Sequence, residues 1–228
     1  EFPFIVRSEF PSEEEQYRIY RTIVERMQGK PVTLRTLDVG GDKVLPYFPM
    51  ANRANPVLGM RAIRFTLRHR DIFRDQLCAM LRAAVGADCR ILFPMVSSLD
   101  EFILASDIVR ECAVRLTSQG VPHLETPLVG AMIELPAAVE IADELADTAD
   151  FLCIGSNDLV QYILAVDRTN EAVADLYLPQ HPAVLRSLKR VADAARRHET
   201  PISICGEIAA SEKLLPFLLG IGLRRFSV

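Results

Sequence analysis

The feature that most constrains the fold of this chain is the regular alternation of short apolar runs with helical segments. Strand-type runs that are apolar throughout, separated by helices, predict a parallel sheet covered on its faces. Both a doubly wound sheet and a barrel satisfy this pattern. The expected strands cover residues 31–37, 91–96, 128–133, 151–154 and 201–204, and a last strand starts at Phe226.

Helix start and stop signals fall between these runs. Ser12 and Glu15 form a capping box that predicts a helix to Met27, and Ser98 with Glu101 caps a long helix to about Ser118. Further helices are expected to start at Asn55-Pro56, near Asp71, at Pro136 (to Leu145), at Asn157, at Pro182 (to His198) and at Ser211 (to Gly220).

Length and strand number limit the possible architecture. The 228 residues, half of them apolar, are enough to bury a large core, and no repeat or flexible linker divides them. A barrel needs eight strands, so six clear strands would leave it unclosed. The chain starts without methionine at Glu1 and stops in strand-like sequence, so we expect an internal piece of a longer protein. The missing strand material should lie upstream, with residues 2–6 as a possible remnant of another strand.

Composition excludes several classes of function. With 30 acidic and 26 basic residues, the net charge of −4 excludes a nucleic-acid grip built on bulk positive charge. The apolar runs are too short to span a membrane, and no targeting peptide opens the sequence. The sequence has five cysteines and no Cys-x-x-Cys pair, which indicates reduced thiols. We therefore expect a cytoplasmic protein that binds neither nucleic acid nor membrane.

Polar residues gather where the predicted strands end, which is where parallel α/β folds carry their chemistry. Two carboxylates on neighbouring strand ends, Glu134 and Asp158, suit a hard cation such as Mg²⁺. Alternatively, these two residues merely cap the helices that follow. Arg35, Arg61 and Arg168 supply fixed positive forks for phosphate and carboxylate groups. Together they describe a site for a small anion that carries phosphate.

Cys205 is the most specific single candidate for a catalytic residue. It ends an apolar strand and precedes Gly206 and Glu207, so its thiol should point into the mouth of the sheet. A thiol with an ordinary pKa of about 8.5 is mostly protonated at neutral pH and can act as a general acid. The alternative is a buried cysteine that only packs, which is the reading we give to the other four cysteines.

The same residues carry a family resemblance. Five motifs, in the right order, closely resemble the phosphoenolpyruvate-binding barrel of the phosphoenolpyruvate–protein phosphotransferases, Enzyme I of the bacterial phosphotransferase system. They are RTLDVGGDK at 35–43, GMRAIR at 59–64, GSNDLVQY at 155–162, AVDR at 165–168 and CGE at 205–207. The segments FPSEEEQ at 10–16 and GKPVTLR at 29–35 are most similar to the nitrogen-regulatory branch.

The resemblance implies a fold and a set of roles. The fold is a (β/α)8 TIM-type barrel, truncated so that the first strand and most of the second are missing. Residues 1–228 then form one phosphoenolpyruvate-binding domain, incomplete at both ends. Glu134 and Asp158 would ligate Mg²⁺, and Cys205 would protonate the enolate as pyruvate forms. The phosphate and carboxylate of the substrate would be held by Arg35, Arg61, Asn157 and Arg168.

The resemblance also implies partners. The phosphoryl group would pass to a histidine on a separate N-terminal domain and then to a small phosphocarrier protein of the HPr type. The family dimerises through its barrel, so a homodimer is expected. Two alternatives are another phosphoenolpyruvate-using enzyme, such as pyruvate phosphate dikinase or phosphoenolpyruvate synthase, and a sensor without catalysis. Departures from the common motif at Leu135, Ser156, Val160 and 210–211 remove none of the proposed ligands.

Overall fold

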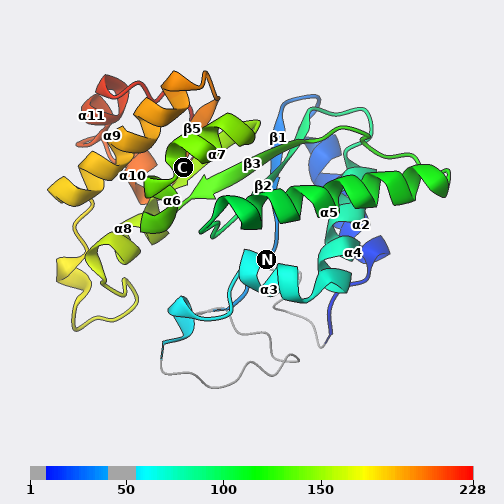
Figure 1. The fold of residues 1–228 in the computed structure, drawn as a ribbon, viewed down its shortest axis with the longest axis horizontal. Helices are drawn as coiled ribbons and strands as arrows, with labels where there is room; N and C mark the ends of the chain where they lie inside the picture. The colour runs from blue at the N-terminus through cyan, green and yellow to red at the C-terminus, as the bar shows by residue number, and fades with distance from the viewer. Residues whose placement is uncertain (1–8, 41–54, 228) are drawn as a thin grey trace. The chain divides into compact units, whose positions relative to one another are not determined.

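The computed structural model describes residues 9–40 and 55–227 (Figure 1). The chain divides into two compact units. Unit 1 comprises residues 1–94 and 101–129, and unit 2 comprises residues 95–100 and 130–228. The expected strand remnant at 2–6 and the part of the glycine loop at 41–43 lie outside the described residues.

Unit 1 is built on two parallel strands, β1 (Val32–Arg35) and β2 (Cys89–Phe93), which pair from Val32 opposite Cys89 to Arg35 opposite Leu92. Helix α2 (Glu13–Arg26) begins at the predicted capping box and packs against α4 (Arg70–Ala83). The unit also holds a 3₁₀ turn, η1 (Pro56–Leu58), then α3 (Ile63–Arg68) and most of α5 (Leu99–Ser118).

Aromatic side chains fill the core of unit 1. Phe73 of α4, Phe93 of β2 and Phe102 of α5 are fully buried. The ring of Phe93 meets the other two rings edge to face, with centroids 6.2 and 5.9 Å apart. This geometry is favoured by the ring quadrupoles and adds to the free energy gained by burial.

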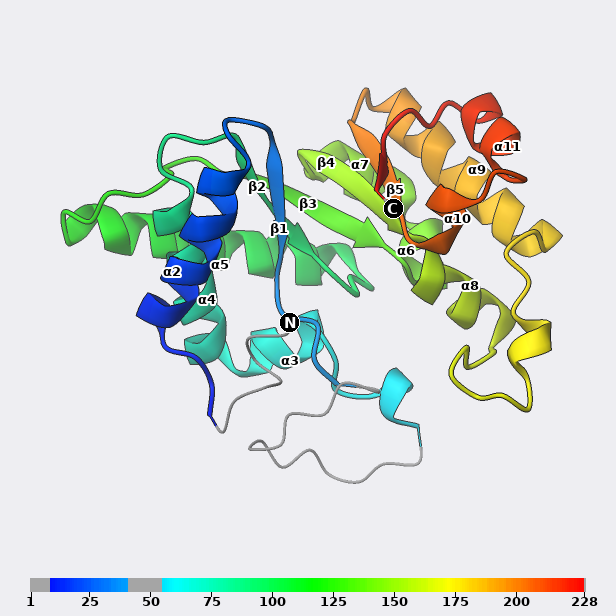
Figure 2. The ribbon, with the colours of Figure 1, turned by 180° about the vertical axis from the view of Figure 1, so that it is seen from behind.

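Unit 2 is built on four parallel strands. They are β3 (Leu128–Ile133, from Gly130 onward in this unit), β4 (Phe151–Gly155), β5 (Ile202–Cys205) and β6 (Phe226–Ser227). The connections contain α6 (Pro136–Glu140), α7 (Ala142–Thr148), α8 (Ser156–Leu164), η2 (Ala174–Leu176), α9 (Pro182–Arg197), α10 (Glu207–Ala210) and α11 (Leu215–Gly220). Helices α7 and α9 pack against each other (Figure 2).

The strand order confirms the predicted fold class. Within unit 2, strands that are neighbours in the sheet are consecutive in the sequence, and all are parallel. A doubly wound sheet reverses its strand order at a switch point, whereas a (β/α)8 barrel keeps chain order. The described residues hold six strands rather than the eight of a closed barrel, as the truncated-barrel prediction requires.

Three helix predictions are wrong in detail. Asn55-Pro56 starts only the 3₁₀ turn η1, and the next α-helix, α3, begins at Ile63. The helix expected from Pro136 to Leu145 is two helices, because the backbone at Ile141 leaves the helical region. Ser211 does not cap the helix that ends at Gly220, since that helix starts at Leu215. Pro216 lies in its first turn, where a missing N–H costs nothing, and this favours the later start.

Within residues 9–40 and 55–227, no helix combines the length and the apolar character that crossing a bilayer requires.

Candidate functional site

The carboxyl ends of β3, β4 and β5 meet at one edge of unit 2. Ile133 pairs with Ile154, and Gly155 pairs with Cys205, so the residues that follow β3 and β4 lie beside the end of β5. This edge gathers Glu134, Asn157, Asp158 and Cys205, which we call the strand-end cluster. The prediction that chemistry concentrates at these strand ends is consistent with this arrangement.

Glu134 is held in place by backbone contacts. Its side chain is buried, and its Oε1 accepts a hydrogen bond of 2.6 Å from the backbone N–H of Met95. A Cβ on Gly155 would lie 2.5 Å from Oε2, so only glycine leaves room for this carboxylate. Helix α6 has no side-chain cap. The printed contacts of the Glu134 carboxylate thus lie outside α6, and its role as a metal ligand stays a prediction.

Asp158 is the second buried carboxylate of the cluster. It lies in the first turn of α8, where the helix dipole favours a negative charge, and is 8 % exposed. Among the residues with described positions, no group of three or more His, Cys, Asp or Glu side chains forms a ready metal site. Two carboxylates fit Mg²⁺, because this ion usually takes one or two and completes its octahedron with water and substrate phosphate.

Asn157 and Ser156 fasten the start of α8 to the segment that follows β5. The Ser156 hydroxyl donates to the carbonyl oxygen of Cys205 at 2.7 Å, and Asn157 Oδ1 accepts from the backbone N–H of Glu207 at 2.9 Å. Gly206 adopts φ +94°, and a Cβ there would lie 2.6 Å from both side chains. The bond at Oδ1 fixes the orientation of the amide, and the amino group of Asn157 is the end that can donate to an anion.

Cys205 is partly exposed, as expected for a thiol at the mouth of the sheet. Its S–H donates to the carbonyl oxygen of Ile154 at 3.4 Å, and the Sγ of Cys153 lies 3.7 Å from its own Sγ. Cys153 is buried, but its contact with Cys205 was not predicted. Cys153 and Gly155 share a face of β4, and Gly155 pairs with Cys205, so the contact follows from a strand register that the sequence does not reveal.

Arg168 lies in the loop that leaves α8. That helix ends at Leu164, and its C-cap residue Ala165 adopts the left-handed conformation. Gln161 Oε1 accepts a hydrogen bond of 3.2 Å from the Arg168 backbone N–H. The Arg168 side chain is half-buried. The structure thus places Arg168 in unit 2, together with the strand-end cluster.

The other two predicted arginines belong to unit 1, where Asp38 joins them. Asp38 and Arg61 are both buried and form a bidentate pair, with Nε–Oδ1 at 2.8 Å and Nη2–Oδ2 at 3.1 Å. Arg35 Nη1 lies 3.6 Å from Asp38 Oδ2. The carbonyl oxygen of Val39 accepts from the backbone N–H of Ala62 at 3.1 Å, which fixes the two segments together. Asp38 therefore aligns both arginines.

Comparison with known proteins identifies the family. The family described as PEP-utilising enzyme, PEP-binding domain, where PEP is phosphoenolpyruvate, matches residues 1–228. The chain belongs to this family. The resemblance found in the sequence is thereby confirmed, and relatives of this PEP-binding domain agree with it.

Relatives named phosphoenolpyruvate-protein phosphotransferase match the PEP-binding domain over all of its length. The proteins from Geobacillus stearothermophilus and Bacillus subtilis are 49% and 45% identical to it over 228 residues. The chain covers 39% and 40% of these two proteins, so it spans about two fifths of their length.

Solved structures support the fold of the PEP-binding domain. An HpcH/HpaI aldolase from Desulfitobacterium hafniense matches 92% of this chain and 70% of its own, with a TM-score of 0.50 and 16% identity. A citrate lyase from Burkholderia xenovorans matches 67% of this chain and 48% of its own, with a TM-score of 0.51 and 18% identity. At this identity the likeness concerns the fold alone.

Proposed function

We propose that this chain is the phosphoenolpyruvate- and Mg²⁺-binding domain of a phosphoenolpyruvate–protein phosphotransferase. The full protein would pass the phosphoryl group to a histidine of a separate N-terminal domain, then to a phosphocarrier protein of the HPr type, and release pyruvate. The observation that carries the proposal is the strand-end cluster: two buried carboxylates, an oriented amide and a partly exposed thiol, in a chain of this family.

The assigned roles follow from the charge of the substrate. Phosphoenolpyruvate carries about three negative charges, and Arg35, Arg61, Arg168 and the amino group of Asn157 supply positive or donating groups for it. Glu134 and Asp158 would hold Mg²⁺, which when bound neutralises charge on the transferring phosphoryl group. The side chains of Arg61, Glu134 and Asn157 are held by neighbouring groups before substrate arrives, and such preorganisation favours transition-state stabilisation.

Cys205 would complete the reaction as a general acid. Loss of the phosphoryl group leaves the enolate of pyruvate, whose methylene carbon needs one proton. The S–H bond of Cys205 breaks, its proton forms the new C–H bond, and the thiolate regains a proton from solvent. The partial exposure of Cys205 supports this role, because a general acid must be able to reach the carbon that it protonates.

Metal-dependent binding tests the proposal directly. In calorimetric titrations, phosphoenolpyruvate is expected to bind in the presence of Mg²⁺. Binding should be at least about tenfold weaker without Mg²⁺ or in the Glu134→Ala and Asp158→Ala variants, since each removes a ligand of the ion. The measurement is made on this chain and on the full-length protein. A folded full-length protein that shows no binding would refute the proposal.

Substitution of Cys205 separates an enzyme from a sensor. In the full-length protein, Cys205→Ala is expected to keep phosphoenolpyruvate binding within about twofold and to lower turnover by about 10²- to 10⁴-fold, the usual contribution of a general acid. Pyruvate release is the measured quantity. Undiminished turnover in Cys205→Ala would show that this thiol is not the acid.

The homodimer, the cytoplasmic location and the nitrogen-regulatory branch stay predictions, as does the absence of a nucleic-acid or membrane partner.

A further inference from the structure

Tyr177 connects a loop of unit 2 to the helix that carries Asn157 and Asp158. It follows the 3₁₀ turn η2 in the loop between α8 and α9, residues 165–181. Its hydroxyl donates to the backbone carbonyl oxygen of Asn157 at 3.2 Å, although the two residues are 20 positions apart in the sequence. One side chain therefore fastens the loop to the first turn of α8.

The Tyr177 hydroxyl is a permanent donor. Burial, with the charge of Glu207 as the next cause, raises the pKa of Tyr177 to about 12, so the phenol stays protonated at neutral pH. Arg168 and Asp158 also act electrostatically on this phenol. Tyr177 thus lies among the groups assigned above to substrate and metal.

The same loop is fastened at a second point. The backbone N–H of Arg168 donates to Gln161 Oε1 at 3.2 Å, so both contacts tie the loop to α8. Asn157 is in turn held at two atoms, by Tyr177 at its carbonyl oxygen and by the Glu207 N–H at Oδ1. Arg168 and Asn157 are therefore positioned relative to each other through Tyr177 and α8.

We propose that Tyr177 is a positioning residue, which orients Asn157 and the Arg168 loop for phosphoenolpyruvate through its hydrogen bond to the Asn157 carbonyl oxygen. The inference rests on the proposed function and adds a residue to it. Tyr177 itself need not touch the substrate.

The Tyr177→Phe variant removes the hydroxyl and keeps the ring. The Kd for phosphoenolpyruvate with Mg²⁺ is expected to rise about three- to tenfold, the range that corresponds to the loss of one hydrogen bond. Without ligand, backbone amide hydrogen exchange over 165–181 should become faster, while exchange in β3 and β4 stays unchanged. The matched control is Tyr17→Phe on α2 of unit 1, which should alter neither quantity.

The outcomes separate this inference from the proposed function. If the wild-type protein binds phosphoenolpyruvate and Tyr177→Phe binds it equally tightly, the positioning role is refuted and the proposed function stands, whatever the exchange rates show. If the wild-type protein does not bind, the proposed function fails, and this inference fails with it. A weaker affinity with faster loop exchange, absent from the control, supports the inference.

Discussion

Replacement of Asp38 by alanine is expected to lower the free energy of unfolding by about 3–5 kcal/mol, the cost of breaking a buried ion pair from one side. Asp38 is 0% exposed and Arg61 is 3% exposed, and the pair is bidentate. Without this carboxylate, the buried guanidinium of Arg61 loses an ion pair that compensates for its lost hydration. Denaturant unfolding of the chain, followed by circular dichroism, measures the change.

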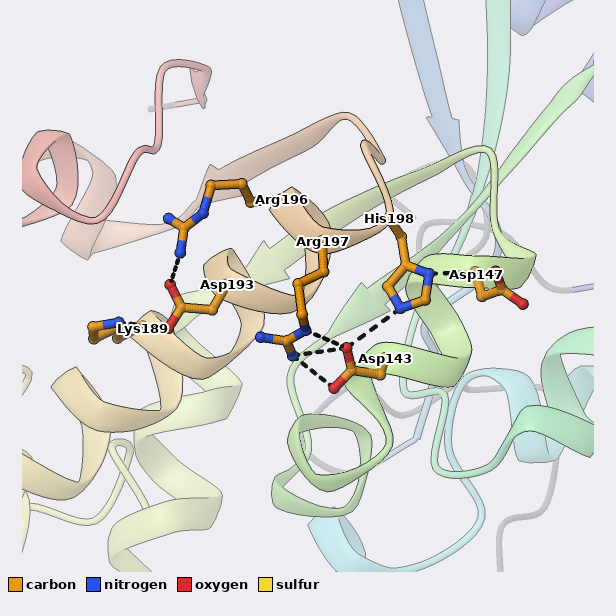
Figure 3. A network of polar contacts seen from close by, with 7 residues as sticks. All are labelled: Asp143, Asp147, Lys189, Asp193, Arg196, Arg197 and His198. Atoms are coloured by element: carbon orange, nitrogen blue, oxygen red, sulfur yellow. Dashed lines mark hydrogen bonds and ion pairs between the residues drawn. The ribbon is translucent and has the colours of Figure 1, made fainter.

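An exposed pair in unit 2 provides the matched control for Asp38→Ala. Arg197 contacts Asp143 through Nε and Nη2 at 2.7–2.9 Å, and His198 contacts the same carboxylate (Figure 3). The hydrogen bond from Arg197 holds the pKa of Asp143 below its ordinary value. Because both side chains are about half exposed, Asp143→Ala should cost less than about 1 kcal/mol. A similar loss in both variants would contradict the argument from burial.

Gly155→Ala is expected to remove Mg²⁺-dependent phosphoenolpyruvate binding, with Kd raised at least about tenfold. The new methyl group would lie 2.5 Å from Glu134 Oε2 and 2.9 Å from Glu134 Cβ, closer than real Cβ contacts come. Glu134 has little room to yield, because its other oxygen is held by Met95 and the side chain is buried. Overpacking should also cost about 1–3 kcal/mol of stability.

The control for this substitution is Gly220→Ala at the end of α11. A Cβ on Gly220 meets nothing within 4 Å, so stability and binding should both change little. Titration calorimetry and denaturant unfolding are run on both variants. If Gly155→Ala binds phosphoenolpyruvate with wild-type affinity, then the packing of Gly155 against Glu134 does not hold the carboxylate for Mg²⁺.

The sequence was sufficient to predict what depends on local pattern and topology. Apolar runs and helix signals locate the strands, and parallel strands must bring their carboxyl ends to one edge. For that reason the common edge of Glu134, Asp158 and Cys205 was predictable without the structure, while their chemical roles stay predictions. Where the local signals compete, as at Ile141 within the expected helix and at Ser211 before Pro216, the sequence alone gave the wrong boundaries.

The missed contacts depend on pairings between distant parts of the chain. Asp38 and Arg61 are 23 residues apart, and no local period relates them. The contact of Cys153 with Cys205 needs the register in which Gly155 faces Cys205. Tyr177 lies in a loop without periodicity, and only the return of that loop to α8 reveals its partner.

The bonds that join the start of α8 to the end of β5 have a consequence for how such a site can change over time. Ser156 and Asn157 bind the main chain of Cys205 and Glu207, a carbonyl oxygen and an N–H group that almost every amino acid provides. The side chains at 205 and 207 take no part in these two bonds. The residue at 205 can therefore be exchanged while the two bonds that hold its backbone are kept, so the side-chain chemistry at this position can change without loss of the surrounding structure.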